Sequence, residues 1–264
     1  DFLLARAADD LADRLGVITR RFPFALDWAS PGPHGAEVLA TSGLCDTILR
    51  AAPIPAAQGY GPWQTLVCDP ALVPVKPQSL DLITSLLALQ TVDDLPGTLV
   101  QLRRALKPDG LLIGAMLGGE SLHELRNVMM EAETRCEGGV SPRVAPFAGV
   151  RDIGGLLQRA GFALPVTDSD LVTVRYNTLF DLVHDLRRMA ASNPLLARRK
   201  QPLKQQTQIE AARLYAEQFS DPDGRIRARF ELIWFSGWAP HPDQQKPLKP
   251  GSAQMRLADA LKAK

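Results

Sequence analysis

The sequence predicts an α/β fold in which helices cover both faces of a largely parallel sheet. Short, continuous apolar segments alternate with segments of helical periodicity, and several of the apolar segments end in turn-forming residues. Strands that are buried on both faces have such continuous apolar runs, and their alternation with helices defines the doubly wound class. Hydrophobic residues make up 45% of the chain, which is sufficient for a full core.

The composition narrows the functional classes. A length of 264 residues fits one domain, so we expect a single domain over residues 1–264. The net charge of +1 gives no reason to expect a nucleic-acid partner. The 3 cysteines form no CxxC pair, which argues against a disulfide framework or a zinc site and favours a reducing compartment. No apolar run reaches the roughly 20 residues of a membrane span. We expect a cytoplasmic protein, or a mitochondrial matrix protein if the source is eukaryotic.

The first half of the chain has the expected alternation of elements. Leu4, Leu11, Leu15 and Ile18 recur at helical spacing with charged residues between them, which predicts an amphipathic helix over 1–21. Further on we expect strands at 22–28, 65–68, 80–89 and 111–117, helices at 35–40 and 93–106, and turns at 29–35 and 107–110.

The second half predicts an inserted helical unit. Two helices, over 179–191 and 206–219, are separated by a polar, basic stretch and precede a strongly β-prone segment at 229–238. We expect them to form a cap over approximately 177–224, inserted before the last strand. The other expected elements are a helix at 150–160 and strands at 162–168 and 172–176.

Several long segments resemble one protein family. They are LKPDGLLIGAMLGGESLHELR (106–126), EGGVSPRVAPFAGVRDIGGLLQRAGF (137–162), DLRRMAASN (185–193), DPDGRIRARFELIWFSGW (221–238) and KPGSA (249–253). The chain resembles the methyltransferase-related assembly factors of mitochondrial complex I and their bacterial homologues. Malonyl-carrier-protein methyltransferases are wider relatives.

This resemblance implies a Rossmann-like class I methyltransferase fold, with a seven-stranded, mostly parallel sheet whose last strand is reversed. It implies binding of S-adenosylmethionine. For the mitochondrial members it also implies hydroxylation of an arginine on a complex I subunit.

The expected cofactor loop departs from the family pattern. The family typically has ALDLGCGRG after the first strand, whereas this chain has ALDWASPGPHG at 25–35. Asp27 is retained, but the glycine-rich turn is not, and Pro31 and Pro33 lack an N–H donor. The expected cofactor-binding residues here are Asp27, Trp28, Ser30 and Gly32.

Three more residues are candidates for the cofactor site. Asp46 is the only carboxylate between residues 41 and 62 and is the candidate for the second-strand acid that grips the ribose. Asp69 follows the third strand, where the family places an acid near the adenine, and Ser85 lies in the fourth. The alternative for Asp27 and Asp69 is that each caps the turn or helix that follows it.

The segment after the fifth strand supplies the candidates for chemistry. His123 follows a strand's carboxyl end and could act as a base near neutral pH; the alternative is a solvated first helical turn. Arg126 and the loop residues Ser141, Arg143 and Phe147 are candidates for substrate binding, and a purely structural loop is the alternative. The histidines show no metal-ligand spacing, so no metal site is expected.

The cap carries a cluster of basic residues that could receive an acidic partner, either a carrier protein or a subunit tail. For any single residue, a solvated helix face is the alternative. The cluster consists of Arg187, Arg188, Arg198, Arg199, Lys200 and Lys204.

Three functions remain open on the sequence. The first is a methyltransferase-like protein that binds S-adenosylmethionine and modifies a protein partner. The second is a carboxyl O-methyltransferase acting on a carrier-bound acyl group. The third is a non-catalytic assembly or scaffold factor, which the altered loop favours.

Overall fold

The computed structural model describes residues 2–53, 61–189 and 191–244. Its centre is a 7-stranded sheet with strand order β3-β2-β1-β4-β5-β7-β6. The first five strands in this order pair in parallel, and β7 runs antiparallel to both of its neighbours. The predicted fold class is thereby confirmed. The strands are β1 (Phe24–Trp28), β2 (Thr47–Ala52), β3 (Gln64–Val67), β4 (Leu80–Leu86), β5 (Leu106–Leu117), β6 (Ala163–Tyr176) and β7 (Ile226–Trp238).

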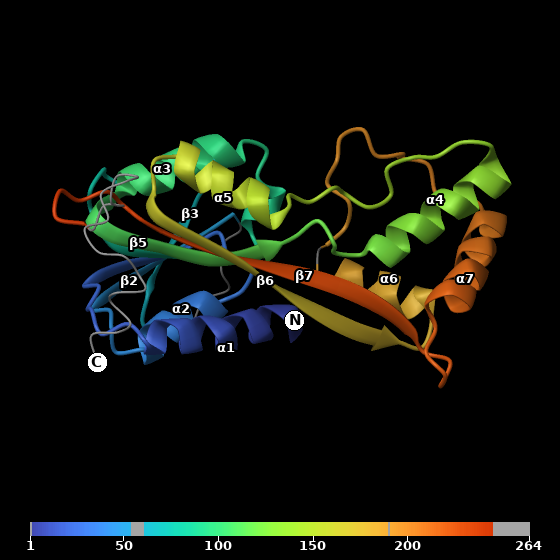
Figure 1. The fold of residues 1–264 in the computed structure, drawn as a ribbon, viewed down its shortest axis with the longest axis horizontal. Helices are drawn as coiled ribbons and strands as arrows, with labels where there is room; N and C mark the ends of the chain where they lie inside the picture. Colours follow the sequence, from blue (N-terminus) through green and yellow to red (C-terminus); the bar gives the residue numbers. More distant parts are fainter. Residues whose placement is uncertain (1, 54–60, 190, 245–264) are drawn as a thin grey trace, which may run out of the picture.

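Helices cover both faces of the sheet (Figure 1). α3 and α5 lie on one face, and α1 and α2 lie on the other. α4, α6 and α7 gather beyond the edge at which the parallel strands end, which we call the carboxyl edge; the opposite edge is the amino edge. The helices are α1 (Phe2–Gly16), α2 (His34–Thr41), α3 (Leu95–Ala105), α4 (His123–Glu137), α5 (Val150–Arg159), α6 (Leu179–Arg188) and α7 (Gln205–Phe219), with a 3-10 turn η1 (Leu89–Thr91).

The core forms three apolar clusters that match this layering. One contains Trp28 and Leu102 and lies between the sheet and α3 and α5. A second contains Leu11 and lies between the sheet and α1 and α2. The third contains Leu214 and Phe230 and joins α4, α6 and α7 to β7. The helices beyond the carboxyl edge therefore have a core of their own.

The two expected cap helices do lie between β6 and β7. α6 begins with a capping box, in which Thr178 Oγ1 accepts from the Asp181 N–H at 3.2 Å and Asp181 Oδ2 accepts from the Thr178 N–H at 3.0 Å. α7 buries Tyr215, whose hydroxyl donates to the Arg227 carbonyl at 3.0 Å. Local capping and apolar burial thus fix α7 against β7, and α6 against α7 and β6.

The structure differs from the sequence prediction in several elements, and α4 is a 15-residue helix where only a first helical turn was considered. The strand β2 was not predicted, because Arg50 interrupts its short apolar segment. β6 is one strand rather than two, since pairing with β7 continues through the polar residues Ser169 and Asp170. The predicted turn at 107–110 is the start of β5, where the register with β4 shifts and Asp109 has a φ of 63°.

Gly114 in β5 lies too close to β4 for any side chain. A Cβ there would be 2.3 Å from the Ser85 carbonyl oxygen, whereas a Cβ on Gly155 in α5 would meet nothing within 4 Å. We expect Gly114→Ala to lower the free energy of unfolding by about 2 kcal/mol or more through overpacking. The control, Gly155→Ala, should raise it by about 0.5–1 kcal/mol because glycine weakens a helix. Urea denaturation checks both values, and equal effects would contradict this account.

Candidate functional site

A buried hydrogen-bond network lies where β1 and β4 end. Asp27 is fully buried, and its Oδ1 accepts from Ser30 Oγ at 2.5 Å and from Thr84 Oγ1 at 3.5 Å. Ser30 Oγ in turn accepts from the Leu86 N–H at 3.0 Å. The loop after β1 is therefore tied directly to the end of β4, at the place where ligands bind in doubly wound folds.

Burial sets the protonation of Asp27. Desolvation raises its pKa from 3.8 to about 7, against the hydrogen bonds of Ser30 and Thr84, the charge of Arg50 and the Ala36 N–H, which all lower it. At neutral pH the carboxyl group therefore exchanges between its neutral and charged forms.

Arg50 is a site residue that the sequence analysis missed. It lies on β2 opposite Asp27 and is only 5% exposed. Its Nη2 donates to the Ser30 carbonyl at 3.1 Å, and its Nε donates to the Gly32 carbonyl at 3.3 Å. The Nε atom also lies 3.7 Å from Asp27 Oδ2. Its only sequence signal is an arginine inside the otherwise uncharged segment TILRAA.

Three non-glycine residues at the carboxyl edge adopt the left-handed conformation. Ala29 follows β1 with a φ of 58°, Leu87 follows β4 with a φ of 51°, and Leu122 precedes α4 with a φ of 55°. Each costs roughly 1–2 kcal/mol. The backbone N–H groups of Ala29 and Leu87 are held by the carbonyls of Ala51 and Ala115, both at 2.8 Å. Strain of this kind clusters at functional sites.

Several buried polar atoms near this edge have no hydrogen-bond partner among the described residues. They are Trp28 Nε1, Ser85 Oγ and Gln90 Oε1. Buried polar groups are normally paired, so a ligand with hydroxyl or amino groups would complete their hydrogen bonding. The amide nitrogen of Gln90 donates to the Leu87 carbonyl at 2.6 Å, which holds Gln90 at the end of β4.

The two remaining acidic candidates lie at opposite edges of the sheet. Asp69 follows β3 at the carboxyl edge, and its Oδ1 accepts from the Ala71 N–H at 2.8 Å, as a turn cap does. Asp46 precedes β2, so it lies at the amino edge, where it pairs with Arg21 on the surface. The prediction that Asp46 is the second-strand acid at the ribose is therefore corrected. Asp46 lies at the start of β2, and the length of this strand separates it from the carboxyl edge.

His123 has both ring nitrogens engaged. Arg229 Nη2 lies 2.9 Å from Nε2, and the Glu120 carbonyl lies 3.3 Å from Nδ1, which fits a ring with its proton on Nδ1. Arg229 also donates through Nε to the buried Glu124 at 2.6 Å. A proton-transfer role for His123 stays a prediction and would require Arg229 to release Nε2.

Ser141 and Arg143 bind a carboxylate of their own chain. Glu133 on α4 is fully buried and accepts from the Ser141 N–H at 2.7 Å, from Ser141 Oγ at 2.8 Å and from Arg143 Nε at 2.7 Å. Arg199 Nη1 lies 3.8 Å from the same carboxylate. We call these four residues the Glu133 cluster. The substrate-binding role expected for Ser141 and Arg143 stays a prediction, and the geometry gives both a structural one.

The other two substrate candidates also have contacts within the chain. Arg126 Nη2 donates to the Ser121 carbonyl at 3.4 Å. Phe147 packs against the cluster that joins α4, α6 and α7 to β7. Both residues lie near the carboxyl edge, and their contact with a substrate remains a prediction.

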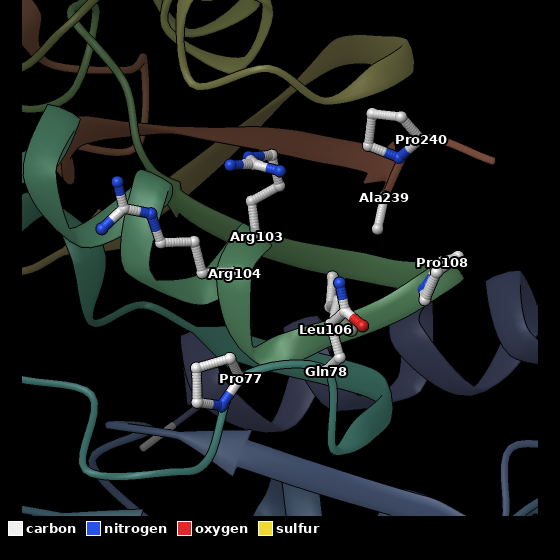
Figure 2. Close-up of a pocket in the computed structure, with 8 residues that line it drawn as sticks. All are labelled: Pro77, Gln78, Arg103, Arg104, Leu106, Pro108, Ala239 and Pro240. Carbon is white, nitrogen blue, oxygen red and sulfur yellow. The ribbon is translucent and has the colours of Figure 1, made fainter.

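A pocket of about 270 Å³ lies away from this site (Figure 2). Arg103 and Arg104, from the last turn of α3, line it together with Pro77, Pro108 and Pro240. Pro77 precedes β4 and Pro108 lies near the start of β5, so this pocket is at the amino edge. It does not include the Asp27 network.

The described part of the chain holds neither a membrane-spanning helix nor a metal-binding cluster. No helix there is long and apolar enough to cross a bilayer. No group of three or more His, Cys, Asp or Glu residues is placed to hold a metal ion within residues 2–53, 61–189 and 191–244.

Comparison with known proteins identifies the family. A family profile described as a methyltransferase domain matches residues 44–114. The chain is 37% identical to the mitochondrial arginine-hydroxylase NDUFAF5 of Danio rerio over 273 residues, covering 99% of this chain and 83% of that protein. The chain belongs to the NDUFAF5 family. The resemblance drawn from the residues is thereby confirmed.

More distant similarities agree with the methyltransferase fold of this NDUFAF5 homologue. A malonyl-[acyl-carrier protein] O-methyltransferase of Xylella fastidiosa is 33% identical over 181 residues, covering 69% of this chain and 59% of the enzyme. A crystal structure assigned as a methyltransferase from Bacillus halodurans has a TM-score of 0.59 at 15% identity, covering 88% of this chain and 98% of that one.

Proposed function

We propose that this NDUFAF5 homologue modifies an arginine side chain of a protein partner, with a ligand bound at the carboxyl ends of β1 and β4. The observation that carries the proposal is similarity over nearly the whole chain to proteins named arginine-hydroxylases. Those relatives are named as mitochondrial, so a matrix location for a eukaryotic chain belongs to the same proposal.

The residues at the carboxyl edge fit an adenosyl ligand such as S-adenosylmethionine. Ser85, Gln90 and Trp28 offer buried polar atoms that have no hydrogen-bond partner in the described part of the chain. Asp69 follows β3, which is separated from β1 by β2. These side chains would bind the hydroxyl and amino groups of the nucleoside, while the Asp27 network fixes the loop beneath it. When bound, S-adenosylmethionine supplies an activated methyl group. The remaining work of this chain's residues is to position the partner's arginine.

A second candidate is a non-catalytic assembly factor. It is favoured by the position of Arg50, whose guanidinium donates hydrogen bonds to the carbonyls of Ser30 and Gly32 in the loop after β1. The carrier methyltransferase remains an alternative, supported by the Xylella fastidiosa relative and the basic residues of the cap. Ligand binding separates the enzymatic candidates from the scaffold.

Isothermal titration with S-adenosylmethionine and S-adenosylhomocysteine tests the ligand site. We expect at least one of them to bind with micromolar affinity, and Asp69→Ala to weaken binding about tenfold by removing a charged hydrogen-bond acceptor. The matched control is Asp46→Ala at the amino edge, which should leave binding unchanged. No binding of either ligand at millimolar concentration would contradict the proposal and favour the scaffold.

Peptide mass spectrometry tests the chemistry in cells with and without the gene. If an arginine of a partner protein is lighter by the mass of one oxygen atom in the cells that lack the gene, the result would support hydroxylation. Loss of a methylene's mass would instead support methylation. If the masses of all arginine-containing peptides are the same with and without the gene, the result would contradict the modification of arginine.

A further inference from the structure

We propose that Arg50 sets the charge of the ligand at the carboxyl edge, so that the site selects an adenosyl compound with an uncharged thioether over one with a sulfonium. The inference rests on the proposed ligand site and names the charge class of its occupant.

The positive charge of Arg50 lies beside the loop that follows β1. Arg50 comes from the interior of β2 and is 5% exposed, so water screens its charge poorly. Its side chain reaches the loop that follows β1, since it donates to carbonyls of that loop at 3.1 and 3.3 Å. The charge therefore lies at the loop over which a ligand of this fold binds.

The positive charge of Arg50 is incompletely balanced. Asp27, at 3.7 Å, is the acidic group that lies within ion-pair distance of Arg50 in the described part of the chain. Its carboxylate is also shared with Ser30 and Thr84. Because burial raises its pKa to about 7, Asp27 is only partly charged at neutral pH. Net positive charge remains beside the loop.

The carbonyl dipoles of the loop are already bound to Arg50. A sulfonium is stabilised by nearby carbonyl oxygens, which carry partial negative charge. The carbonyls of Ser30 and Gly32 are instead bound to the Arg50 guanidinium. A thioether needs no such partners, so the loop as folded suits the uncharged sulfur better. A second positive charge within about 10 Å, at an effective dielectric constant near 20, weakens binding about tenfold.

The experiment measures the ratio of the dissociation constants of S-adenosylmethionine and S-adenosylhomocysteine by isothermal titration. Arg50→Met removes the charge and keeps the length of the side chain. Arg21→Met is the matched control, because it removes one arginine charge from the surface at the amino edge. Asp27→Asn is a second variant that removes the balancing charge and leaves Arg50 in place. Circular dichroism confirms that each variant is folded.

We expect the wild type to favour S-adenosylhomocysteine about tenfold, Arg50→Met to bring the ratio near one, and Arg21→Met to leave it at the wild-type value. Asp27→Asn should increase the preference for S-adenosylhomocysteine. If Arg50→Met does not fold, the ratio measured for Asp27→Asn tests the inference on its own. A ratio near one in the wild type, or a ratio unchanged by both site variants, would overturn the inference and leave the ligand site standing. Binding of neither ligand by the wild type and the folded variants would instead contradict the ligand site itself.

Discussion

Asp27→Asn is expected to remove a fall in stability that the wild-type chain undergoes between about pH 4 and pH 7. The folded-state pKa of Asp27 is raised by burial to about 7 from an ordinary 3.8. Between these values the unfolded chain releases the proton and the folded chain keeps it. The folded state then binds more protons, so the free energy of unfolding decreases as pH rises. The full difference is on the order of 4 kcal/mol, an upper bound for a group that shares hydrogen bonds.

Urea denaturation at several pH values checks this expectation. The asparagine side chain at position 27 does not titrate, so the stability of the variant relative to the wild type should increase from pH 4 to pH 8. Carboxylates with lowered pKa, such as Glu210 and Asp223, are common to both proteins and cancel in the difference. A stability difference that does not change with pH for Asp27→Asn would show that Asp27 is ionised in the fold throughout this range.

Glu133→Ala is expected to destabilise the chain by about 3–5 kcal/mol, the loss seen when one partner of a buried ion pair is removed. Glu133 is fully buried, and the Arg143 side chain that binds it is 15% exposed. The substitution also leaves the Ser141 N–H without its acceptor. Thermal or urea unfolding measures the loss, and limited proteolysis should show earlier cleavage between α4 and α5.

Two further variants make this expectation specific to the buried pair. Glu217→Ala breaks an exposed pair with Arg213 and should cost less than about 0.5 kcal/mol. Adding Arg143→Ala to Glu133→Ala removes the uncompensated charge and should restore part of the stability. If Glu133→Ala and Glu217→Ala cost the same, the Glu133 cluster contributes no more than a surface ion pair.

The fold class was predictable because its signals are local. Continuous apolar strands, helical periodicity and turn residues are each readable within a short window, and β4 and the apolar part of β5 match such segments closely. β2 was not predicted, because Arg50 is charged and its partners lie in a distant loop. Without β2, the edge on which Asp46 lies could not be assigned.

The candidate site was predictable only in part, for a related reason. Asp27 follows from the family pattern, and Ser30 and Ser85 follow from their places near strand ends. Glu133 gives no signal, because a single glutamate in a helix has the pattern of a solvated face. Its burial depends on the loop after α4 folding back over it, which no local spacing encodes.

The long β6–β7 ribbon has a consequence for how a partner would be recognised. Its ladder pairs Tyr176 with Ile226 at one end and Ala163 with Trp238 at the other, so one continuous element belongs both to the sheet and to the base of the cap. α6 and α7 are thus mounted on hydrogen-bonded strands rather than on a hinge. A partner docking there would meet a preorganised surface and lose little entropy in ordering it. Its selectivity would then come from matching a fixed shape, and affinity differences among partners would appear mainly in how slowly they dissociate.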